Sequence, residues 1–389
     1  MSQRDEILDL LRGLSALLVM LGYLRALTFL SFGELTSPNL LIKIFYFSTG
    51  LGHQAVMVFF VLSGYFVGGS VMSGLRDESF SWRRYSLARL SRLWVVLIPA
   101  LFLTLIFDHF GSHWNPEAYA GEYRARFASG PTIANPAEHG VLTGLGNLAF
   151  LQTVTIPVFG SNGPLWSLAN EFWYYTLFPL IALPIFHLIY RSEGRAFHQR
   201  LCRPFSLCQL LMGLILIWWL PRGLLLAGLI WMLGVLVWVI TRQSGVETQT
   251  RNRLWKFVSG GLFIVTLVAS KTNSPLGSDF CVGLAFSIWM PFLLGGWSNP
   301  RWWTRLSSAV SDFSYTLYVV HFPVFFFMAA VFLKGHQFMP NLEGFICYST
   351  FAVIGIAISA GMWGLFERNT WKVRRWIASR LLPTAKTTT

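Results

Sequence analysis

The segment from residue 8 to residue 31, LDLLRGLSALLVMLGYLRALTFLS, restricts the possible folds of this chain more than any other. A helix needs about 20 mostly apolar residues to cross a lipid bilayer, and this segment is long enough. It also contains Arg12 near its start. A charged side chain inside a membrane segment is costly unless it faces a bundle interior or a wet cavity and finds partners there. The segment therefore predicts a membrane helix with Arg12 on an inward face, as a candidate site residue.

Helical geometry identifies a second polar position on that face. In an ideal helix with about 100° between successive residues, residue 23 returns to the face of Arg12 about three turns later. That residue is Tyr23. The two side chains would lie roughly 16 Å apart along the helix axis. We interpret them as two points of a polar path through a membrane bundle.

The composition indicates further membrane helices. The chain of 389 residues is 54% hydrophobic and only 12% charged, with 34 Phe, 34 Gly and 17 Trp. Repeated apolar runs of this composition are typical of polytopic helical membrane proteins. The net charge of +13 would suggest nucleic acid in a soluble protein, but here the basic residues gather between apolar runs, so no nucleic-acid partner is expected. The cysteines form no CxxC pair, which argues against a zinc site or a disulfide framework; they are Cys202, Cys208, Cys281 and Cys347.

The apolar runs predict an all-α fold, a polytopic bundle of ten transmembrane helices with both termini cytoplasmic. Residues 76–92 would form a short basic loop after the second span, and residues 108–143 a long polar segment after the third. The expected spans are residues 8–31, 54–73, 93–107, 165–190, 205–220, 223–241, 257–271, 279–297, 311–333 and 344–366.

Residues 144–158 are also apolar, but the charge distribution argues against an eleventh span. With ten spans, 22 lysines and arginines fall in inner segments and seven in outer segments, which follows the positive-inside rule. An eleventh span would invert every later loop. We therefore predict a transmembrane domain over residues 1–370, in which an outer loop of residues 108–160 holds a re-entrant or surface helix. Residues 371–389 would form a basic cytoplasmic tail.

Two local patterns concern helix ends and helix packing. Ser161 or Asn162 can cap the fourth span, and Pro164 suits a first helical position. Residues 59–64, FFVLSG, end in small residues that allow the backbones of membrane helices to approach closely. The first pattern predicts where a helix starts, and the second predicts a close helix contact.

Glu171 is a candidate catalytic acid or base. It would lie about two turns inside the fourth span, with Ser167 and Tyr175 four residues to either side on its face. It could act in acid-base chemistry or pair with a cation such as Arg12, or it could only order the start of the helix. The cost of a carboxylate in a membrane favours the functional interpretation.

His53 stands just before the second span. There it could approach the outer end of the first helix, near Tyr23 or Arg25, and take part in catalysis. An ordinary interfacial histidine is the alternative.

The ninth span carries a polar stripe. Ser314, Tyr318 and His321 follow one another at helical spacing in SDFSYTLYVVHFP, and His321 should lie near the middle of the membrane. Either His321 is a buried histidine with a satisfied hydrogen bond, or it lines a substrate tunnel.

Asp108, His109 and His113 are the nearest approach to a metal-binding pattern. Gly111 would interrupt a helix between the two histidines, and no third ligand is evident. No metal site is therefore expected.

Four arginines after the second span form a candidate cofactor-binding group. They can grip the phosphates of a cofactor, or they can act only as topology determinants, and both interpretations stay open. They are Arg83, Arg84, Arg89 and Arg92.

Taken together, the motifs resemble the acyltransferase-3 family of integral-membrane O-acyltransferases. They occur in the family's order and cover nearly the whole membrane domain. The matching stretches are DLLRGLSALLV (9–19), VMVFFVLSGYFVGG (56–69), RRYSLARLSRLWVVLIPA (83–100), GPLWSLANEFWYYTLFPL (163–180) and SYTLYVVHFP (314–323), with Phe366 and Glu367 ending the tenth span.

The resemblance implies transfer of an acyl group, usually acetyl, from cytoplasmic acyl-CoA to a hydroxyl, commonly on a glycan outside the membrane. In the family's pattern a histidine, which acts as the catalytic base, stands where this chain has Tyr23. A phenol has a reference pKa near 10, against about 6.5 for imidazole, so alone it is a poor base at neutral pH. Either Tyr23 is activated by Arg25 or a neighbouring base, or His53 supplies the imidazole, or the protein is catalytically impaired.

The resulting hypothesis is a multi-pass O-acyltransferase of the bacterial inner membrane that uses acyl-CoA, with acetyl-CoA as the expected donor, and no metal. Its partners would be membrane lipid and a glycan or other hydroxyl acceptor. The rival is a relative that binds or moves a lipid or glycan without turnover; a secondary transporter is disfavoured because no inverted repeat is evident. The expected catalytic residues are Tyr23, Arg12, Glu171 and His53, and the expected tunnel residues are Ser63, Trp166, Ser167, Tyr175, Tyr318 and His321.

Overall fold

The computed structural model of the chain is helical. It describes residues 3–189, 196–243, 253–272, 274–294 and 301–381, and within these ranges it contains isolated β-bridges but no strand. The predicted loops around residues 191–195 and 244–252 and the end of the predicted tail lie outside the described residues. The chain divides into two compact units. Unit 1 comprises Met1–Val56, Trp82–Ser167 and Trp297–Thr389, and unit 2 comprises Met57–Ser81 and Leu168–Gly296.

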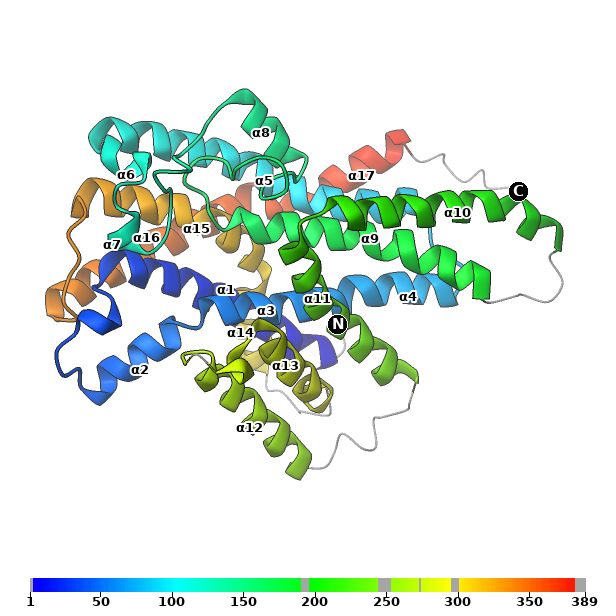
Figure 1. Ribbon diagram of the computed structural model, residues 1–389, viewed down its shortest axis with the longest axis horizontal. Helices are drawn as coiled ribbons and strands as arrows, with labels where there is room; N and C mark the ends of the chain where they lie inside the picture. The colour runs from blue at the N-terminus through cyan, green and yellow to red at the C-terminus, as the bar shows by residue number, and fades with distance from the viewer. Residues whose placement is uncertain (1–2, 190–195, 244–252, 273, 295–300, 382–389) are drawn as a thin grey trace. The chain divides into compact units, whose positions relative to one another are not determined.

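Unit 1 contains the helices of both ends of the chain and of the segment after residue 82 (Figure 1). Its last helix, α17, covers part of the predicted tail. The helices are α1 (Gln3–Thr28), α2 (Leu40–Thr49), α5 (Trp82–Trp114), α6 (Pro116–Ala120), α7 (Arg124–Phe127), α8 (Val141–Leu148), α14 (Arg301–Asp312), α15 (Ser314–Met328), α16 (Leu342–Leu365) and α17 (Thr370–Leu381), with the π-helix η5 (Ala329–Leu333) after α15.

Unit 2 contains the middle of the chain. Two helices belong to both units, because the division falls between Val56 and Met57 in α3 and between Ser167 and Leu168 in α9. The helices are α3 (Gly52–Ser63), the π-helix η2 (Gly64–Gly68), α4 (Gly69–Arg76), α9 (Leu165–Ile189), α10 (Ala196–Trp219), α11 (Arg222–Gln243), α12 (Arg253–Ala269) and α13 (Asp279–Leu293).

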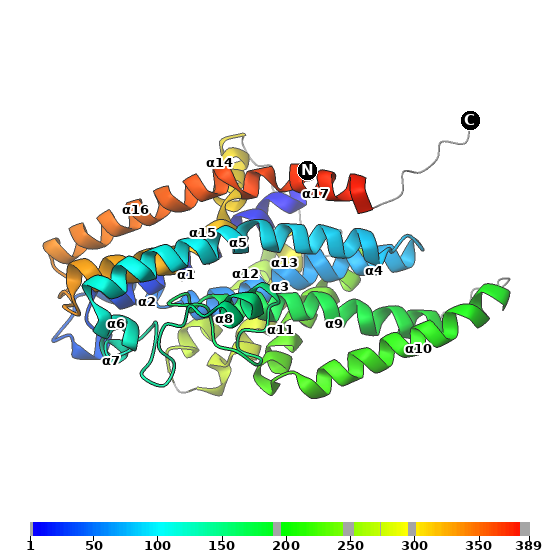
Figure 2. The same cartoon turned by 90° about the horizontal axis from the view of Figure 1, so that it is seen from above.

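Helix α15 is the centre of unit 1. All its residues except Tyr315 and Phe327 are buried. It contacts α1, α5 and α16, and both views show α5 and α16 running alongside it (Figure 1, Figure 2). Its sequence, SYTLYVVHFPVFFFM, is apolar around most of its circumference, as expected of a helix surrounded by protein. The polar side chains of α15 other than that of Tyr315 are therefore buried within unit 1.

In unit 2, α11 packs on η2 and α13. The contact with η2 is very close, because a Cβ atom on Gly64 would lie 1.9 Å from the carbonyl oxygen of Trp231. A Cβ atom on Gly234 would likewise lie 1.9 Å from the carbonyl oxygen of Val61. The close contact predicted for residues 59–64 is thus confirmed, and it needs a glycine on each helix.

Six helical segments among the described residues are long and apolar enough to cross a membrane. Three shorter apolar helices cover Pro204–Trp219, Leu254–Ala269 and Asp279–Leu293. Each of the ten predicted spans contains a helix, but the count of ten crossings and the side on which the termini lie stay predictions. The six spanning segments are Glu6–Thr28, Leu40–Arg76, Trp82–Trp114, Arg222–Arg242, Ser314–Leu333 and Leu342–Arg380.

Two sequence-based predictions about α5 were wrong, and one later helix was missed. Residues 76–92 are mostly helical rather than a loop, because α5 already begins at Trp82. Gly111 does not interrupt that helix, which continues to Trp114. Its missing side chain instead leaves room for the ring of Tyr119, whose hydroxyl would lie 2.0 Å from an added Cβ. The helix α14, before the ninth predicted span, was not foreseen.

The predicted cap of the fourth span was also wrong. The hydroxyl of Ser161 donates to Asp108 Oδ1 at 2.7 Å. The amide nitrogen of Asn162 donates to the carbonyl oxygen of Val319 at 2.9 Å and to Thr104 Oγ1 at 3.2 Å. Both side chains therefore hold distant segments of unit 1 together instead of capping α9.

Asp108 fastens the loop between α5 and α9 to α5. Its side chain is fully buried, and its Oδ2 atom lies 2.8 Å from His139 Nε2 and accepts a 2.7 Å hydrogen bond from the Ser161 amide. The loop includes α8, which at eight residues is shorter than a membrane span. Asp108, considered above as part of a metal pattern, is thus held by hydrogen bonds within unit 1.

Candidate functional site

Arg12 is held on α1 by two neighbours within unit 1. Its Nη2 atom lies 3.2 Å from Asp9 Oδ1, one helical turn earlier, and donates to Ser311 Oγ on α14 at 2.5 Å. The hydroxyl of Ser311 donates in turn to Asp9 at 3.3 Å. The buried Nε atom of Arg12 has no hydrogen-bond partner among the described residues. Asp9 and Ser311 therefore fix the orientation of the guanidinium, and its Nε–H is available to donate to a ligand.

Further charged groups surround Arg12. Arg92 on α5, Glu367 after α16 and Asp312 at the end of α14 are close enough to interact with it electrostatically. Arg92 also interacts in this way with Glu367. Two cations and three acids thus gather in unit 1, and they make the surroundings of Arg12 strongly polar.

Glu367 also caps the central helix. Its Oε2 atom accepts the backbone amide of Thr316 at 3.1 Å and the hydroxyl of Thr316 at 2.5 Å. Thr316 lies in the first turn of α15, where amides lack helical partners and the helix dipole favours a negative charge. A residue from the end of the membrane domain therefore supplies the cap that no neighbour in sequence supplies.

We expect Glu367→Gln to lower the free energy of unfolding by about 1–3 kcal/mol, since two hydrogen bonds to a half-buried charge are weakened. Chemical unfolding of the purified protein in detergent, followed by circular dichroism, measures the change. Glu122→Gln, at an exposed turn, serves as the control and should change it by less than about 0.5 kcal/mol. Equal effects of the two substitutions would contradict a capping role for Glu367.

Tyr23 packs against α15. Its ring centroid lies 5.6 Å from that of His321 and 5.0 Å from that of Phe322. His321 is fully buried, and its Nδ1 atom lies 2.8 Å from the carbonyl oxygen of Leu317. A carbonyl only accepts, so Nδ1 carries the proton and Nε2 carries the lone pair. Nε2 has no hydrogen-bond partner among the described residues. A neutral imidazole with an available lone pair therefore lies beside Tyr23.

Trp166 connects Tyr23 with His53. The side chain of Trp166 forms a hydrogen bond with the phenol of Tyr23, and indole nitrogen is a donor only, so the phenol oxygen accepts. The His53 ring is stacked on Trp166 with a centroid distance of 6.3 Å and an interplanar angle of 25°. His53 is exposed. The expected approach of His53 to Tyr23 is thus made through an intervening indole.

Ser167 and Tyr318 form a buried pair next to His321. Their hydroxyl oxygens lie 2.6 Å apart, so one hydroxyl donates to the other, and the carbonyl oxygen of Pro164 lies within reach of both, 3.2 Å from Ser167 Oγ and 3.4 Å from the Tyr318 hydroxyl. The Tyr318 ring centroid lies 6.0 Å from that of His321. Four predicted site residues, on α1, α9 and α15, are therefore neighbours in unit 1: Tyr23, Ser167, Tyr318 and His321.

The remaining predicted tunnel residues form a separate hydrogen-bonded series in unit 2. The indole of Trp231 donates to Ser63 Oγ at 3.1 Å, and Ser63 Oγ lies 3.0 Å from the Tyr175 hydroxyl. Tyr175 donates to Glu171 Oε2 at 3.2 Å. Glu171 thus has a polar environment of its own, and its pairing with Arg12 stays a prediction.

The four arginines of the predicted cofactor group have different surroundings. Arg83 and Arg84 are exposed at the start of α5. Arg89 lies over the ring of Tyr85, with 5.6 Å between the guanidinium carbon and the ring centroid. Arg92 is the member of this group that lies close enough to Arg12 to interact with it electrostatically. The group is therefore spread along three turns of one helix.

Sequence reasoning missed Asp9, Ser311 and Glu367 as partners of the two arginines. Asp9 had a local signal, since it precedes Arg12 by one helical turn. Ser311 and Glu367 had none, because nothing in a single sequence states which distant helix ends meet α1. The described residues also contain no group of three or more His, Cys, Asp or Glu side chains that could hold a metal ion.

The family resemblance is confirmed by comparison with known proteins. A family model described as an acyltransferase domain, that of the acyltransferase-3 family, matches residues 5–361. Neither a curated protein nor a solved structure matches the chain. The match covers every helix from α1 to most of α16 and includes Arg12, Tyr23 and His321. The apolar helices make the chain a multi-pass membrane protein, and it belongs to the acyltransferase-3 family.

Proposed function

We propose that this protein is an O-acyltransferase that moves an acyl group, most simply acetyl, from acyl-CoA to a hydroxyl of a glycan or similar acceptor. Family membership supports the reaction class. The observation that carries the proposal for this particular chain is the lone pair of His321 Nε2, buried and unpartnered among the described residues, beside Tyr23. Tyr23, which holds the family's histidine position, has no imidazole, but the imidazole of His321 lies beside it.

In the proposed reaction, His321 Nε2 accepts the proton of the acceptor hydroxyl. The hydroxyl oxygen attacks the thioester carbonyl carbon, the carbon–sulfur bond breaks, and the imidazolium returns its proton to the leaving thiolate. The phenol of Tyr23 orients the acceptor, and its own position is held by Trp166 and by the ring of Phe322. A neutral imidazole is better suited to this proton transfer than a phenol.

Arg12 would stabilise the negative charge that develops during the reaction. Asp9 and Ser311 hold its guanidinium, so little reorganisation is needed when charge appears. Arg92 adds a second positive charge nearby and is the member of the predicted cofactor group best supported as a phosphate or thioester contact. The roles of Glu171 and of Arg83, Arg84 and Arg89 stay predictions.

We further propose that the protein lies in the bacterial inner membrane with its donor side in the cytoplasm and its acceptor side outside. The distribution of lysine and arginine over the predicted loops supports this orientation.

The alternative function is binding or movement of a lipid or glycan without turnover. It is motivated by Tyr23 alone, at the position where the family's pattern has a histidine. In this case acyl-CoA or the acceptor would bind, but no acyl group would be transferred.

Tyr23 variants test the proposal. Purified protein in proteoliposomes is given radiolabelled acetyl-CoA and an oligosaccharide mixture, and label in water-soluble acetate and in oligosaccharide is measured. The unchanged protein, with Tyr23, should transfer or hydrolyse acetyl-CoA. Tyr23→Phe should lower the rate by less than about tenfold, because it removes one neutral hydrogen bond and keeps the ring. Tyr23→His, which restores the family pattern, should be at least as active as the given sequence.

A second tyrosine variant is the control for this test, and two outcomes would contradict the proposal. Tyr46→Phe removes a phenol that donates to the Leu30 carbonyl at 2.8 Å, away from the proposed site, and should leave the rate unchanged. Activity in Tyr23→His alone would support the alternative function for the chain as it stands. Complete loss in Tyr23→Phe would instead make the phenol itself the base.

A further inference from the structure

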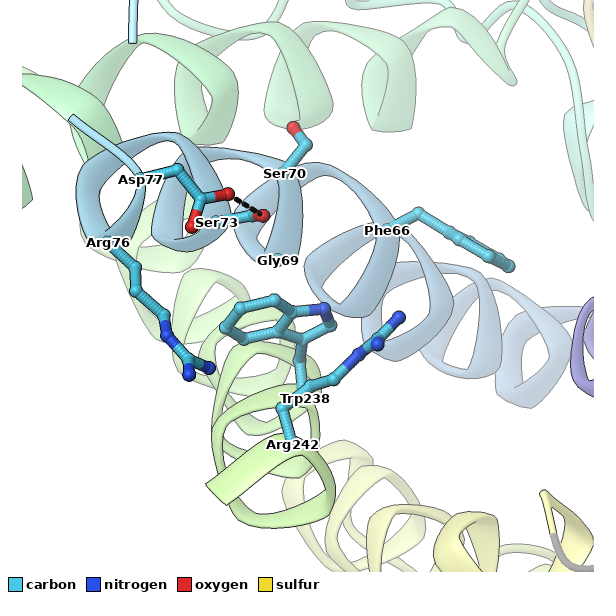
Figure 3. Close-up of a pocket in the computed structure, with 8 residues that line it drawn as sticks. All are labelled: Phe66, Gly69, Ser70, Ser73, Arg76, Asp77, Trp238 and Arg242. Atoms are coloured by element: carbon cyan, nitrogen blue, oxygen red, sulfur yellow. Dashed lines mark hydrogen bonds between the residues drawn. The ribbon is translucent and has the colours of Figure 1, made fainter. Parts of the chain in front are cut away.

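Unit 2 contains a cavity of about 410 Å³ between η2, α4 and the end of α11. The volume lies within the range of about 300–1,000 Å³ that is common for small-molecule sites. All the residues that line it belong to unit 2, and none is in the predicted site. Those that matter for recognition are Ser73, Arg76, Asp77, Trp238 and Arg242 (Figure 3).

The cavity has an excess of positive charge. The lining contains two guanidinium groups, those of Arg76 and Arg242, and one carboxylate, that of Asp77, which already accepts a 3.3 Å hydrogen bond from the Ser73 hydroxyl (Figure 3). Neither guanidinium has an ion-pair or hydrogen-bond partner in the part of the chain that the structure describes. Guanidinium groups bind phosphate through two parallel hydrogen bonds, so two such groups at one cavity favour a phosphorylated ligand.

The cavity also has a fixed aromatic surface. The indole of Trp238 lies between the guanidinium groups of Arg76 and Arg242 (Figure 3). Its five-membered ring packs on Gly69, where an added Cβ would lie 2.4 Å from Trp238 Cδ1. Stacking on an aromatic side chain is the usual way in which proteins hold the flat ring of a nucleobase. The indole therefore offers a second point of recognition beside the two phosphate-binding groups.

From these features we infer that the cavity binds an adenine nucleotide. The base would stack on Trp238, Arg76 and Arg242 would bind the phosphates, and Asp77 would accept a hydrogen bond from the exocyclic amine or a ribose hydroxyl. A phospholipid headgroup shares the phosphate but has no ring for the indole. The nucleotide can be free, or it can be the nucleotide end of coenzyme A, in which case the inference rests on the proposed function.

Binding of 3′,5′-ADP to the full-length protein in nanodiscs of neutral lipid tests the inference, measured by isothermal titration calorimetry. Trp238→Leu and Arg242→Gln should each raise the dissociation constant by roughly tenfold to a hundredfold. Trp218→Leu and Arg222→Gln are matched controls at exposed positions and should bind like the unchanged protein. Arg242 is exposed, so its substitution keeps the test valid even if Trp238→Leu fails to fold.

Further ligands identify the source of the nucleotide. Tight binding of coenzyme A and 3′,5′-ADP but not of ADP assigns the site to coenzyme A, whereas equal binding of ADP assigns it to a free nucleotide. The inference is overturned if 3′,5′-ADP does not bind at millimolar concentration, or if the variants bind it unchanged. It is also overturned if Trp238→Leu and Arg242→Gln weaken only the retention of anionic phospholipid.

The same samples separate this inference from the proposed function. Nucleotide binding without acetyl transfer would leave the cavity assigned and reject the transferase mechanism. Acetyl transfer without binding of 3′,5′-ADP would do the reverse. His321→Asn, which changes unit 1 only, should leave the dissociation constant for 3′,5′-ADP unchanged.

Discussion

Replacing His321 with asparagine is expected to lower acetyl transfer by roughly 10²–10⁴-fold, the contribution of a positioned general base. The side-chain nitrogen of asparagine can take the place of Nδ1 and donate to the Leu317 carbonyl, so this hydrogen bond of residue 321 is kept. What is lost is the lone pair of Nε2 beside Tyr23. The radiolabelled acetyl-CoA assay in proteoliposomes measures the rate.

Two further histidine variants make this result specific. His336→Asn changes an exposed histidine of unit 1 outside the proposed site and should leave the rate unchanged. His53→Ala should have a small effect, because His53 is stacked on Trp166, whose indole makes the hydrogen bond to Tyr23. If His53→Ala abolishes transfer and His321→Asn does not, the base is His53, and the mechanism proposed above is wrong.

Gly234→Ala is expected to lower the free energy of unfolding by about 3 kcal/mol or more, at the upper end of the usual cost of overpacking. The new methyl group would lie 1.9 Å from the Val61 carbonyl oxygen and 2.7 Å from the Tyr65 amide nitrogen. Backbone atoms cannot rotate away as a side chain can, so α11 must move from α3 and η2. That movement also weakens the hydrogen bond from Trp231 to Ser63.

The unfolding of Gly234→Ala can be followed by tryptophan fluorescence during titration with a denaturing detergent. Gly261→Ala, at a mid-helix glycine of α12 with no atom within 4 Å of an added Cβ, is the matched control. It should be neutral or slightly stabilising, since alanine favours helix. A Gly234→Ala protein as stable as this control would show that the close contact of α3, η2 and α11 is not required.

Local sequence was sufficient for the elements that depend on composition and periodicity. The apolar runs of α1, α5, α11, α15 and α16 are helices because a chain in hydrocarbon must satisfy its backbone hydrogen bonds within each segment. The small residues of 59–64 also predicted a close contact correctly. The ordered motifs identified the family, which the match over residues 5–361 confirms.

Prediction from short sequence segments failed where a side chain could bond either to a neighbour in sequence or to a distant helix. Ser161 and Asn162 are good capping residues by type, yet their side chains bond Asp108, Thr104 and Val319 instead. The choice depends on α5 and α15 lying beside them, which no window of sequence contains. A glycine such as Gly111 is likewise a helix breaker by propensity, but packing of Tyr119 on α5 outweighs the modest cost of one glycine.

The sequence by itself determined the helical membrane fold, the family and the presence of Arg12 and Tyr23 on the first helix, because each depends on spacing or composition within a short segment. Only the tertiary structure decided which groups those two residues meet. The packing of α1 on α14 and α15 brings Ser311 to Arg12 and His321 to Tyr23 across about 300 residues of chain. Such contacts arise from the complementary shapes of buried helix faces, and a polar group in a buried face takes the partner that packing brings within reach.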